Sequence, residues 1–447
     1  MRPGALLLAA ALALPLAVPP RAAALDDPAA RTRLTVLDNG LRILTLVDRT
    51  TPVVSFQSWV QVGSGDEARW TGLAHLFEHM MFRGTQNVPG DLRDRLLRAR
   101  GARGNAFTSN DVTVYFEDVT EEHLPLVIDL EADRLRHLVI SPDVLDTERQ
   151  VVLEERRMRS EDSPQGRLIE ALLALSFLAH PYRTPTIGWA SDVAKVDVDA
   201  CLAFFRAYYV PNNLVISIAG DFDEEAAIAR LRERLAGVPR APAPPRNPTE
   251  EPPQRGERRA VVHVPVRAPL VGAAWHAPAA GHPDAYALDA LGEILSAGRT
   301  SRLHRALVYD GQEAISAYGG YWEMERAGLF YAGAGVRPGV DPARVERSLL
   351  EQIERLRETP PSADELEKAK RGLEVALIRG LGTAHALASR NASDLLTYGR
   401  IRPLDERLEA IRALTAEDVR RVARAYLRPD GRSVVHVMPG PDAEAAG

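Results

Sequence analysis

The sequence predicts an α+β fold of two homologous domains, each with helices packed on a largely antiparallel sheet. Strand patterns and helix patterns are mixed within both halves of the 447-residue chain. Between the halves, residues 238–258 read VPRAPAPPRNPTEEPPQRGER, and the seven prolines of this stretch exclude both a helix and a central strand. We therefore expect a first domain at 33–238, an extended linker at 239–258 and a second domain at 259–440.

The two halves resemble each other across one segment. SWVQVGSGDEARWTGLAHLFEHMMFRGT at 58–85 can be laid on AAWHAPAAGHPDAYALDALGEILSAGRT at 273–300 with a one-residue gap. The matched pairs are Trp59 with Trp275, Gly65 with Gly281, Leu73 with Leu288 and Thr85 with Thr300. In the same alignment His75 corresponds to Ala290, Glu78 to Glu293 and His79 to Ile294. The second half is therefore interpreted as a copy that lacks both histidines.

Strands and helices follow from hydrophobic periodicity and turn residues. The first half opens with a hairpin, RLTVLDNGLRILTLVD at 33–48, which turns at Asn39-Gly40 between alternating apolar residues. Further strands are expected at 53–63, 111–119, 213–222, 259–266 and 432–439. Helices are expected near 71–83, 122–139, 142–160, 165–178, 192–208 and 223–236.

The first residues have the pattern of a secretory signal peptide. Arg2 precedes an apolar run from Ala5 to Val18, and small residues follow up to Ala24. We expect cleavage after Ala24, which makes 1–24 a signal peptide and places the mature protein in the periplasm or outside the cell. A bilayer span needs about 20 apolar residues, so no stable membrane span is expected after cleavage. Retention of the segment as an anchor is the alternative.

Composition excludes two further classes of protein. The net charge is −6 with both signs interspersed, so no nucleic-acid partner is expected. Cys201 is the single cysteine, which excludes an intramolecular disulfide framework. It lies in the apolar pattern DACLAFFRAYYV, where buried packing is the expected role.

The segment TGLAHLFEHMMFRGT at 71–85 carries the strongest chemical signal. At about 100° per residue, its apolar residues form one helical stripe and three polar residues fall opposite. The stripe consists of Leu73, Leu76, Phe77, Met80 and Met81, and the opposite face carries His75, Glu78 and His79. Two histidines one turn apart with an adjacent carboxylate are what zinc ligation requires, whereas a solvated face usually carries Lys, Arg, Glu and Gln. Chance places HxxEH in about 2% of chains of this composition, so metal binding is favoured.

A zinc site on this helix needs a third protein ligand, with one position left open for water. The helix predicted to begin at Ser141-Pro142 offers Glu148 and Glu155, which lie two turns apart within its apolar stripe. Carboxylates on a buried face require a compensating positive charge, which is either a metal or one of the abundant arginines. Glu154 points about 100° away from Glu155 and is expected to be a solvated surface acid.

These residues together resemble the pitrilysin family of zinc metallopeptidases, the inverzincins, whose inverted motif is HxxEH. The resemblance is to the two-domain bacterial members, which are similar to mitochondrial processing peptidase, and it spans residues 33–440. GNAFTSNDVTVYFED at 104–118 and YYVPNNLVISIAGDFD at 208–223 also resemble family blocks. The family's third ligand follows the second histidine by about 76 residues, and 155 − 79 = 76 selects Glu155.

The resemblance implies a clamshell that closes around unfolded peptide, and one Zn²⁺ per chain held by His75, His79 and Glu155. It implies that Glu78 takes the proton of the attacking water and that Glu148 orients a ligand histidine. It also implies an edge strand along which the peptide substrate aligns. The residues of this strand are Asn105, Ala106, Phe107 and Thr108.

One segment departs from the family pattern. Autonomous members carry an arginine in the second domain, and a tyrosine further along, that both contact substrate. In SRLHRALVYDGQEAIS these positions hold Val308 and Ile315, whose side chains cannot donate a hydrogen bond. Nearby Arg302, Arg305 and Tyr309 have a different spacing. We expect a homologous partner subunit to supply the missing pair, with a homodimer as the alternative.

The sequence therefore predicts a zinc-dependent endopeptidase that hydrolyses extended or unfolded peptides in the periplasm, with water activated by Glu78. The alternative is a non-catalytic structural or binding subunit of a peptidase-like complex. Intact His75, Glu78 and His79 favour the enzyme, because degenerate subunits usually lose these residues.

Overall fold

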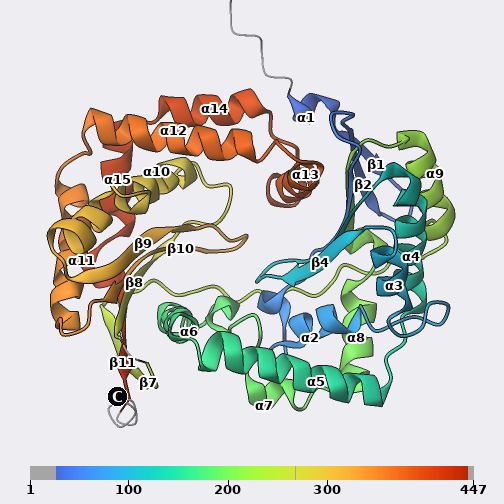
Figure 1. The fold of residues 1–447 in the computed structure, drawn as a ribbon, viewed down its shortest axis with the longest axis horizontal. Helices are drawn as coiled ribbons and strands as arrows, with labels where there is room; N and C mark the ends of the chain where they lie inside the picture. The colour runs from blue at the N-terminus through green and yellow to red at the C-terminus, as the bar shows by residue number, and fades with distance from the viewer. Residues whose placement is uncertain (1–26, 267, 441–447) are drawn as a thin grey trace, which may run out of the picture.

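The computed structural model describes residues 27–266 and 268–440 (Figure 1). The predicted signal peptide and its cleavage point after Ala24 lie outside the described residues. Two lobes, each built on one sheet, stand side by side (Figure 1). Within the described ranges, no helix is both long enough and apolar enough to span a bilayer.

The sheet of the first lobe has six strands in the order β1-β2-β6-β3-β5-β4. Its strands are β1 Arg33–Val36, β2 Arg42–Val47, β3 Val54–Val60, β4 Arg103–Thr108, β5 Thr113–Val119 and β6 Leu214–Gly220. The predicted hairpin at 33–48 is confirmed as β1 and β2, and every neighbouring pair is antiparallel except β2 with β6. β4 is an edge strand, as the family resemblance implied.

The sheet of the second lobe has five strands in the order β7-β11-β8-β10-β9. Its strands are β7 Arg258–Val264, β8 Leu270–Ala277, β9 Ala314–Trp322, β10 Gly328–Val336 and β11 Arg432–Pro439. Only β7 and β11 are parallel. Without β1, the two sheets have the same strand order. The first strand of each lobe, β2 or β7, pairs with the last, β6 or β11, and the middle one, β4 or β9, lies at an edge. This shared topology supports the duplication that the sequence predicts.

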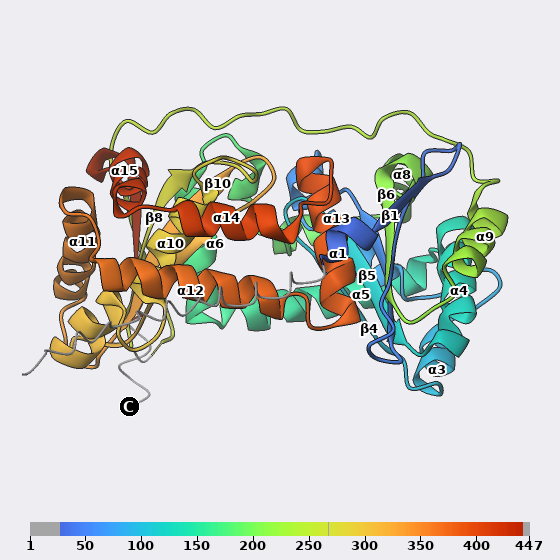
Figure 2. The ribbon, with the colours of Figure 1, turned by 90° about the horizontal axis from the view of Figure 1, so that it is seen from above.

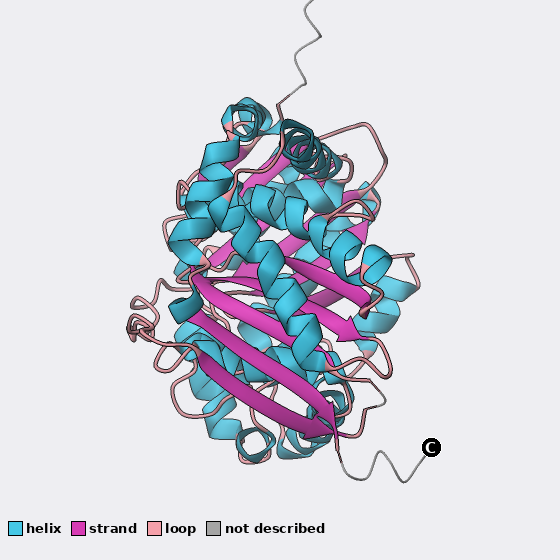
Figure 3. Cartoon of the chain, turned by 90° about the vertical axis from the view of Figure 1, so that its left-hand side faces the viewer, coloured by secondary structure: helices cyan, strands magenta, loops and turns pink. Residues whose placement is uncertain are grey.

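Helices cover both sheets. In the first half they are α1 Pro28–Arg31, α2 Leu73–Met80, α3 Leu92–Arg98, α4 Leu124–His137, α5 Pro142–Arg156, α6 Pro164–Ser176, α7 Ala190–Val193, α8 Val198–Tyr208 and α9 Glu224–Leu235. In the second half they are α10 Ala285–Ser296, α11 Pro342–Glu358, α12 Ala363–Arg379, α13 Ala384–Tyr398, α14 Leu404–Ala413 and α15 Ala416–Tyr426. Helices α11 and α15 pack against the outer face of the second sheet, on the side that faces the viewer in Figure 3.

The helix predicted at 192–208 is interrupted in the structure. α7 ends at Val193, and α8 begins at Val198 after Asp197, whose side chain accepts a hydrogen bond from the backbone N–H of Ala200. An aspartate in this position starts a helix rather than continuing one, because its carboxylate satisfies an N–H group that has no partner inside the helix.

One helix of each half packs on the sheet of the other half (Figures 1 and 2). Leu168 and Leu172 of α6 are buried against strands β7, β8 and β11 of the second sheet. Ala392 and Leu395 of α13 are buried against strands β2, β3 and β6 of the first sheet. Each fully buried leucine contributes about 1.5–3 kcal/mol, so the two halves stabilise each other.

Residues 239–257 contain neither helix nor strand and run from α9 to β7 along one side of the molecule (Figure 2). Arg246 of this segment pairs with Asp66 at 2.9 Å. Glu251 accepts hydrogen bonds from the backbone N–H groups of 178–180. The segment is therefore tied to the first half at both of these points.

Candidate metal centre and peptide cleft

The HxxEH segment forms α2, and the loop before it fixes where the helix starts. Gly72 has φ +83°, and a Cβ there would lie 2.5 Å from the carbonyl oxygen of Ile187, so glycine is required. The Glu67 carboxylate accepts hydrogen bonds of 2.8 Å from the backbone N–H groups of Gly72 and Ala74. A helix start leaves such N–H groups without partners. Burial raises the pKa of Glu67 to about 8, and these two hydrogen bonds oppose the rise. Glu67, which sequence analysis missed, therefore holds the amino end of the histidine helix.

Three predicted ligands meet in the structure: His75 and His79 on α2, and Glu155 on α5. Glu155 Oε2 lies 3.3 Å from His79 Nε2 and 3.8 Å from His75 Nε2, and the ligand atoms all lie within 4.8 Å of one another. Ligand atoms about 2.0–2.1 Å from a tetrahedral Zn²⁺ are about 3.4 Å apart, so this arrangement fits the ion. Two imidazoles and one carboxylate are also a donor set found in catalytic zinc sites. No second group of three such side chains gathers in the described part of the chain.

Glu148, the other acid on the apolar stripe of α5, approaches the second nitrogen of His79. Its Oε2 lies 3.4 Å from His79 Nδ1, and its Oε1 lies 2.7 Å from Arg83 Nε. Glu155 likewise binds Arg159 at 2.7 Å. Both carboxylates therefore have an arginine partner, as the alternative to metal binding predicts. An arginine partner alone does not explain why both acids converge on one imidazole ring.

Glu154 lies at the surface and Cys201 lies in the interior, as the sequence predicts. Glu154 is exposed and binds Arg157 through two hydrogen bonds of 2.6 and 3.0 Å. Cys201 is fully buried in α8, and burial raises the pKa of its thiol to about 12. The thiolate is therefore not available for ligation or nucleophilic attack at neutral pH.

Burial and charge set the protonation of the two histidines in the absence of metal. Burial alone would lower the pKa of His79, but hydrogen bonds with Glu148 and Glu155 outweigh it and raise the pKa to about 9. Burial, reinforced by the charge of His79, lowers the pKa of His75 to about 4. At neutral pH His79, the ring between the carboxylates, therefore carries the extra proton and a positive charge, and His75 is neutral. A divalent cation would replace this proton, because a ligating imidazole must be neutral.

Glu78 contacts the edge strand. Its side chain is 8% exposed, and its Oε2 accepts a hydrogen bond of 2.6 Å from Thr108 Oγ1 at the end of β4. Burial raises the pKa of Glu78, and the hydrogen bond from Thr108 opposes this rise. A carboxylate with a raised pKa beside metal ligands is suited to accept and return a proton.

A cavity of 1640 Å³ opens over these residues. Its wall includes His75, Glu78, His79 and Glu155, together with every residue of β4. The predicted substrate-binding residues Asn105, Ala106, Phe107 and Thr108 thus all lie on the wall. One edge of β4 pairs with β5, and no strand of the described residues lies beside the other edge, which leaves backbone N–H and C=O groups open for pairing. Small-molecule pockets measure about 300–1,000 Å³, so this cavity has room for a peptide segment.

The counterpart of α2 in the second half is α10, which presents no ligand pair. Ala290 and Ile294 are buried in the hydrophobic core of the second lobe. Glu293 lies near Lys368, and burial raises the pKa of its carboxyl. The interpretation of the second half as a copy without histidine ligands agrees with this arrangement.

The positions that hold arginine and tyrosine in the family lie away from the cavity wall. Val308 is in a π-helical segment, and Ile315 is exposed on β9. Arg302, Arg305 and Tyr309 are not among the described wall residues either. Arg302 instead binds Glu365 at 2.6 Å. Trp322 is the only described wall residue that belongs to the second half of the chain. No sequence pattern predicted its place there.

Family models cover most of the chain. The model described as "Insulinase (Peptidase family M16)" matches residues 42–188, and the model described as "Peptidase M16 inactive domain" matches residues 195–373. The chain is 29% identical to the zinc protease PqqE of Helicobacter pylori, over 90% of this chain and 92% of PqqE. It is 32% identical to an uncharacterized zinc protease of Mycobacterium tuberculosis, again over 90% of this chain and 92% of that protein. A probable mitochondrial-processing peptidase subunit beta of Arabidopsis thaliana is 24% identical over 89% of this chain and 77% of that subunit.

Solved structures match over nearly the whole described chain. A crystal structure of a protease from Helicobacter pylori has a TM-score of 0.88 and 28% identity, and the match covers 91% of this chain and 99% of that one. The periplasmic protease PqqL of Escherichia coli has a TM-score of 0.75 and 19% identity, over 93% of this chain and 48% of PqqL, which shows the fold alone. These matches confirm the predicted α+β clamshell of two related halves. The chain belongs to peptidase family M16, the insulinase or pitrilysin family, several of whose bacterial members are named zinc proteases.

Proposed function

We propose that this protein is a zinc-dependent endopeptidase that hydrolyses extended or unfolded peptides. The observation that carries the proposal is the convergence of His75, His79 and Glu155 beside Glu78 on the wall of one large cavity. Membership of family M16 and the relatives named as zinc proteases support it.

Each residue of the cluster has a chemical role in this proposal. Zn²⁺, when bound, acidifies water and polarises the peptide carbonyl. Glu78 accepts the proton of the attacking water and passes it to the leaving amine. Thr108 holds the Glu78 carboxylate in place through its hydrogen bond of 2.6 Å. Glu148 Oε2 lies 3.4 Å from His79 Nδ1, where its charge favours a proton on Nδ1, orients the ring and leaves Nε2 free to ligate.

The substrate in this proposal is a peptide that adds to the free edge of β4 as a further strand. The residues that bind this peptide are Asn105, Ala106, Phe107 and Thr108, which lie on the cavity wall. Pairing with main-chain groups tolerates different side chains, so it suits a peptidase that accepts many unfolded sequences. Because Thr108 at the carboxyl end of β4 contacts Glu78, a peptide bond held at this end lies next to the general base.

In this proposal a homologous partner subunit supplies the arginine and the tyrosine that contact substrate. Val308 and Ile315 occupy the positions of the substrate-binding arginine and tyrosine, and neither side chain donates a hydrogen bond. A second copy of this chain carries the same two residues, which favours a heterodimer over a homodimer. The related processing-peptidase chain is itself named as a subunit. The isolated chain is then weakly active, and full turnover without a partner contradicts this part of the proposal.

The proposed location is the periplasm or the cell exterior. It is based on the signal-peptide pattern of residues 1–24, and the structurally similar PqqL is named a periplasmic protease. Mass spectrometry of the exported protein should find Leu25 as the first residue. A mature protein that begins at Met1 would contradict cleavage.

Zinc content and peptide hydrolysis, measured on wild type and Glu78→Gln, test the proposed function. We expect about one zinc per chain in both proteins, with hydrolysis of an unfolded peptide at least about a hundredfold slower in Glu78→Gln. Loss of zinc in Glu78→Gln would show that the role assigned to Glu78 is wrong. Wild-type protein with well under one zinc, unchanged when His79 is replaced, would favour the non-catalytic subunit instead.

A further inference from the structure

One indole of the second half lies on the cavity wall. Trp322 is the last residue of β9, and it is 36% exposed. The indole N–H has no hydrogen-bond acceptor in the described part of the chain. A tryptophan that is largely covered usually finds a partner for this group. The exposed ring and the open donor therefore both remain available to a molecule that enters the cavity.

The turn that follows Trp322 is anchored to the first half of the chain. Met324 is buried in one apolar cluster with Leu173 and Tyr182, and Leu173 is itself a wall residue of the cavity. Next along the turn, the backbone N–H of Glu325 donates to Asp111 Oδ2 at 3.0 Å. The position of Trp322 is therefore set by contacts with the first half and not by β9 alone.

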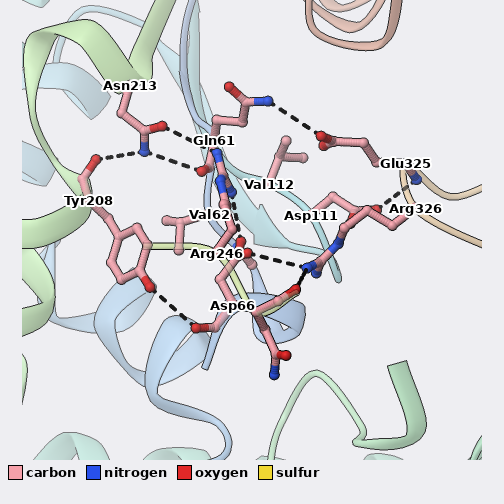
Figure 4. A network of polar contacts seen from close by, with 12 residues as sticks. Gln61, Val62, Asp66, Asp111, Val112, Tyr208, Asn213, Arg246, Glu325 and Arg326 are labelled. Atoms are coloured by element: carbon pink, nitrogen blue, oxygen red, sulfur yellow. Dashed lines mark hydrogen bonds and ion pairs between the residues drawn. The ribbon is translucent and has the colours of Figure 1, made fainter. Parts of the chain in front are cut away.

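Arg326 completes this anchor (Figure 4). Its backbone N–H donates to the hydroxyl of Tyr182 at 3.1 Å, and that hydroxyl donates to Asp111. Its guanidinium lies 3.6 Å from Asp66 Oδ1 and 3.7 Å from Asp111 Oδ1. Asp66 is buried and binds Arg246 of the linker as well, so two arginines neutralise this carboxylate. Removal of one partner from an ion pair at a buried carboxylate is strongly destabilising, so this contact is difficult to break.

The anchor connects Trp322 to the strand proposed to bind substrate. Asp111 lies in the short turn between β4 and β5, three residues after Thr108. The same carboxylate that receives the hydrogen bond from Glu325 therefore belongs to the turn that ends β4. Two parts of the cavity wall from different halves, β4 and Trp322, are held in a fixed relation by this contact.

We propose that Trp322 is a substrate-binding residue contributed by the second half. Its ring packs on an apolar side chain of the peptide that pairs with β4, and its N–H donates to a main-chain carbonyl of that peptide. Aromatic residues with an apolar ring and a polar donor are enriched among the positions that dominate binding energy. The inference depends on the proposed peptidase function, since it names a further contact with the same substrate.

Peptide binding and hydrolysis by Trp322→Ala and Trp322→Phe test this role. The probe is a fluorescein-labelled unstructured peptide with several Leu and Phe residues, followed by fluorescence anisotropy in chelator, where hydrolysis is absent. Trp322→Ala should weaken binding at least about tenfold, and Trp322→Phe less, because it retains the ring but not the donor. Trp189→Phe is the matched control, since Trp189 is 37% exposed and does not line the cavity. Equal thermal unfolding midpoints establish that both Trp322 variants are folded.

Two further results separate a contact with substrate from a structural role. The change in intrinsic fluorescence on addition of unlabelled peptide should disappear in Trp322→Phe and persist in Trp189→Phe. With zinc bound, Trp322→Ala should raise KM with little change in kcat. Peptide affinity of Trp322→Ala within about twofold of wild type would overturn the inference. Hydrolysis that is unaffected by Glu78→Gln while Trp322→Ala loses binding would instead count against the proposed function.

Discussion

Thr108 Oγ1 donates a hydrogen bond of 2.6 Å to Glu78 Oε2. This contact joins the helix that carries both histidines to the edge strand of the first sheet. In the proposed function it places the general base and the peptide-binding strand in one rigid unit. A reacting group held in this way needs little reorganisation when substrate binds.

The first prediction concerns this contact. Thr108→Val keeps the shape of the side chain and removes the donor, so kcat should fall about tenfold or more, as expected for a hydrogen bond to a charged group. Thr108→Ser retains the hydroxyl and should stay within about threefold of wild type. Steady-state kinetics with zinc quantified in each protein provide the measurement. Equal kcat values for Thr108→Val and wild type would show that Glu78 does not need this partner.

The second prediction concerns Glu148, which faces His79 Nδ1 at 3.4 Å. Glu148→Gln should lower zinc affinity about 10–100-fold, because the amide no longer fixes the ring with a charged acceptor. Glu154→Gln is the control on the same helix, since Glu154 is exposed and binds only Arg157 among the described residues. Competition with a chelator measures both affinities. Identical zinc affinity in the two variants would contradict the role of Glu148.

The third prediction follows from the exchange of α6 and α13 between the sheets. Leu168→Ala and Leu395→Ala should each lower the free energy of unfolding by about 2–5 kcal/mol, the usual effect of truncating a buried leucine. Ile378→Ala, on an exposed position of α12, should change it by no more than about 0.5 kcal/mol. Urea unfolding followed by circular dichroism should remain a single transition, because one face of each sheet is covered by a helix of the other half. Two separate transitions would show that the halves fold independently.

The fourth prediction is an acid dependence of stability. Burial would raise the pKa of Glu346, but hydrogen bonds with His436 and Arg259 outweigh it and lower the pKa to about 2. The folded carboxyl therefore binds its proton more weakly than the unfolded one, so its contribution is complete above about pH 4.5 and is lost as pH falls towards 2. Glu346→Gln should lower stability at pH 7 and flatten the decline between these pH values. A decline equally steep in Glu346→Gln would assign it to other carboxyl groups.

Local geometry explains what the sequence predicted well. The arrangement of His75, Glu78 and His79 on one face of α2 depends only on helical spacing, and the structure places all three on the cavity wall. Helical spacing alone does not decide whether Glu155 is paired with an arginine or with a metal. The spacing of the family motif is what selects Glu155 as the third ligand. The structure retains both features, since Glu155 contacts Arg159 as well as the two histidines.

Long-range packing explains what the sequence did not predict. Leu168 and Leu395 have ordinary amphipathic patterns, and nothing in those patterns identifies a sheet of the opposite half as their partner. Trp322 follows a strand that has no distinctive motif, and only the contacts of the next turn with Asp111 bring it to the cavity. Asp197 has a local signal, because an acid directly before a helix start is a recognisable cap. Glu67 has no such signal, because Gly72 is the residue directly before α2.

Anomalous X-ray scattering from crystals of the zinc-loaded protein, collected on both sides of the zinc absorption edge, tests the central claim most directly. The account predicts one zinc peak about 2.0–2.2 Å from His75 Nε2, His79 Nε2 and a carboxylate oxygen of Glu155. Crystals in which Glu155 binds Arg159 and His79, with zinc absent from this position or bound elsewhere, would contradict it.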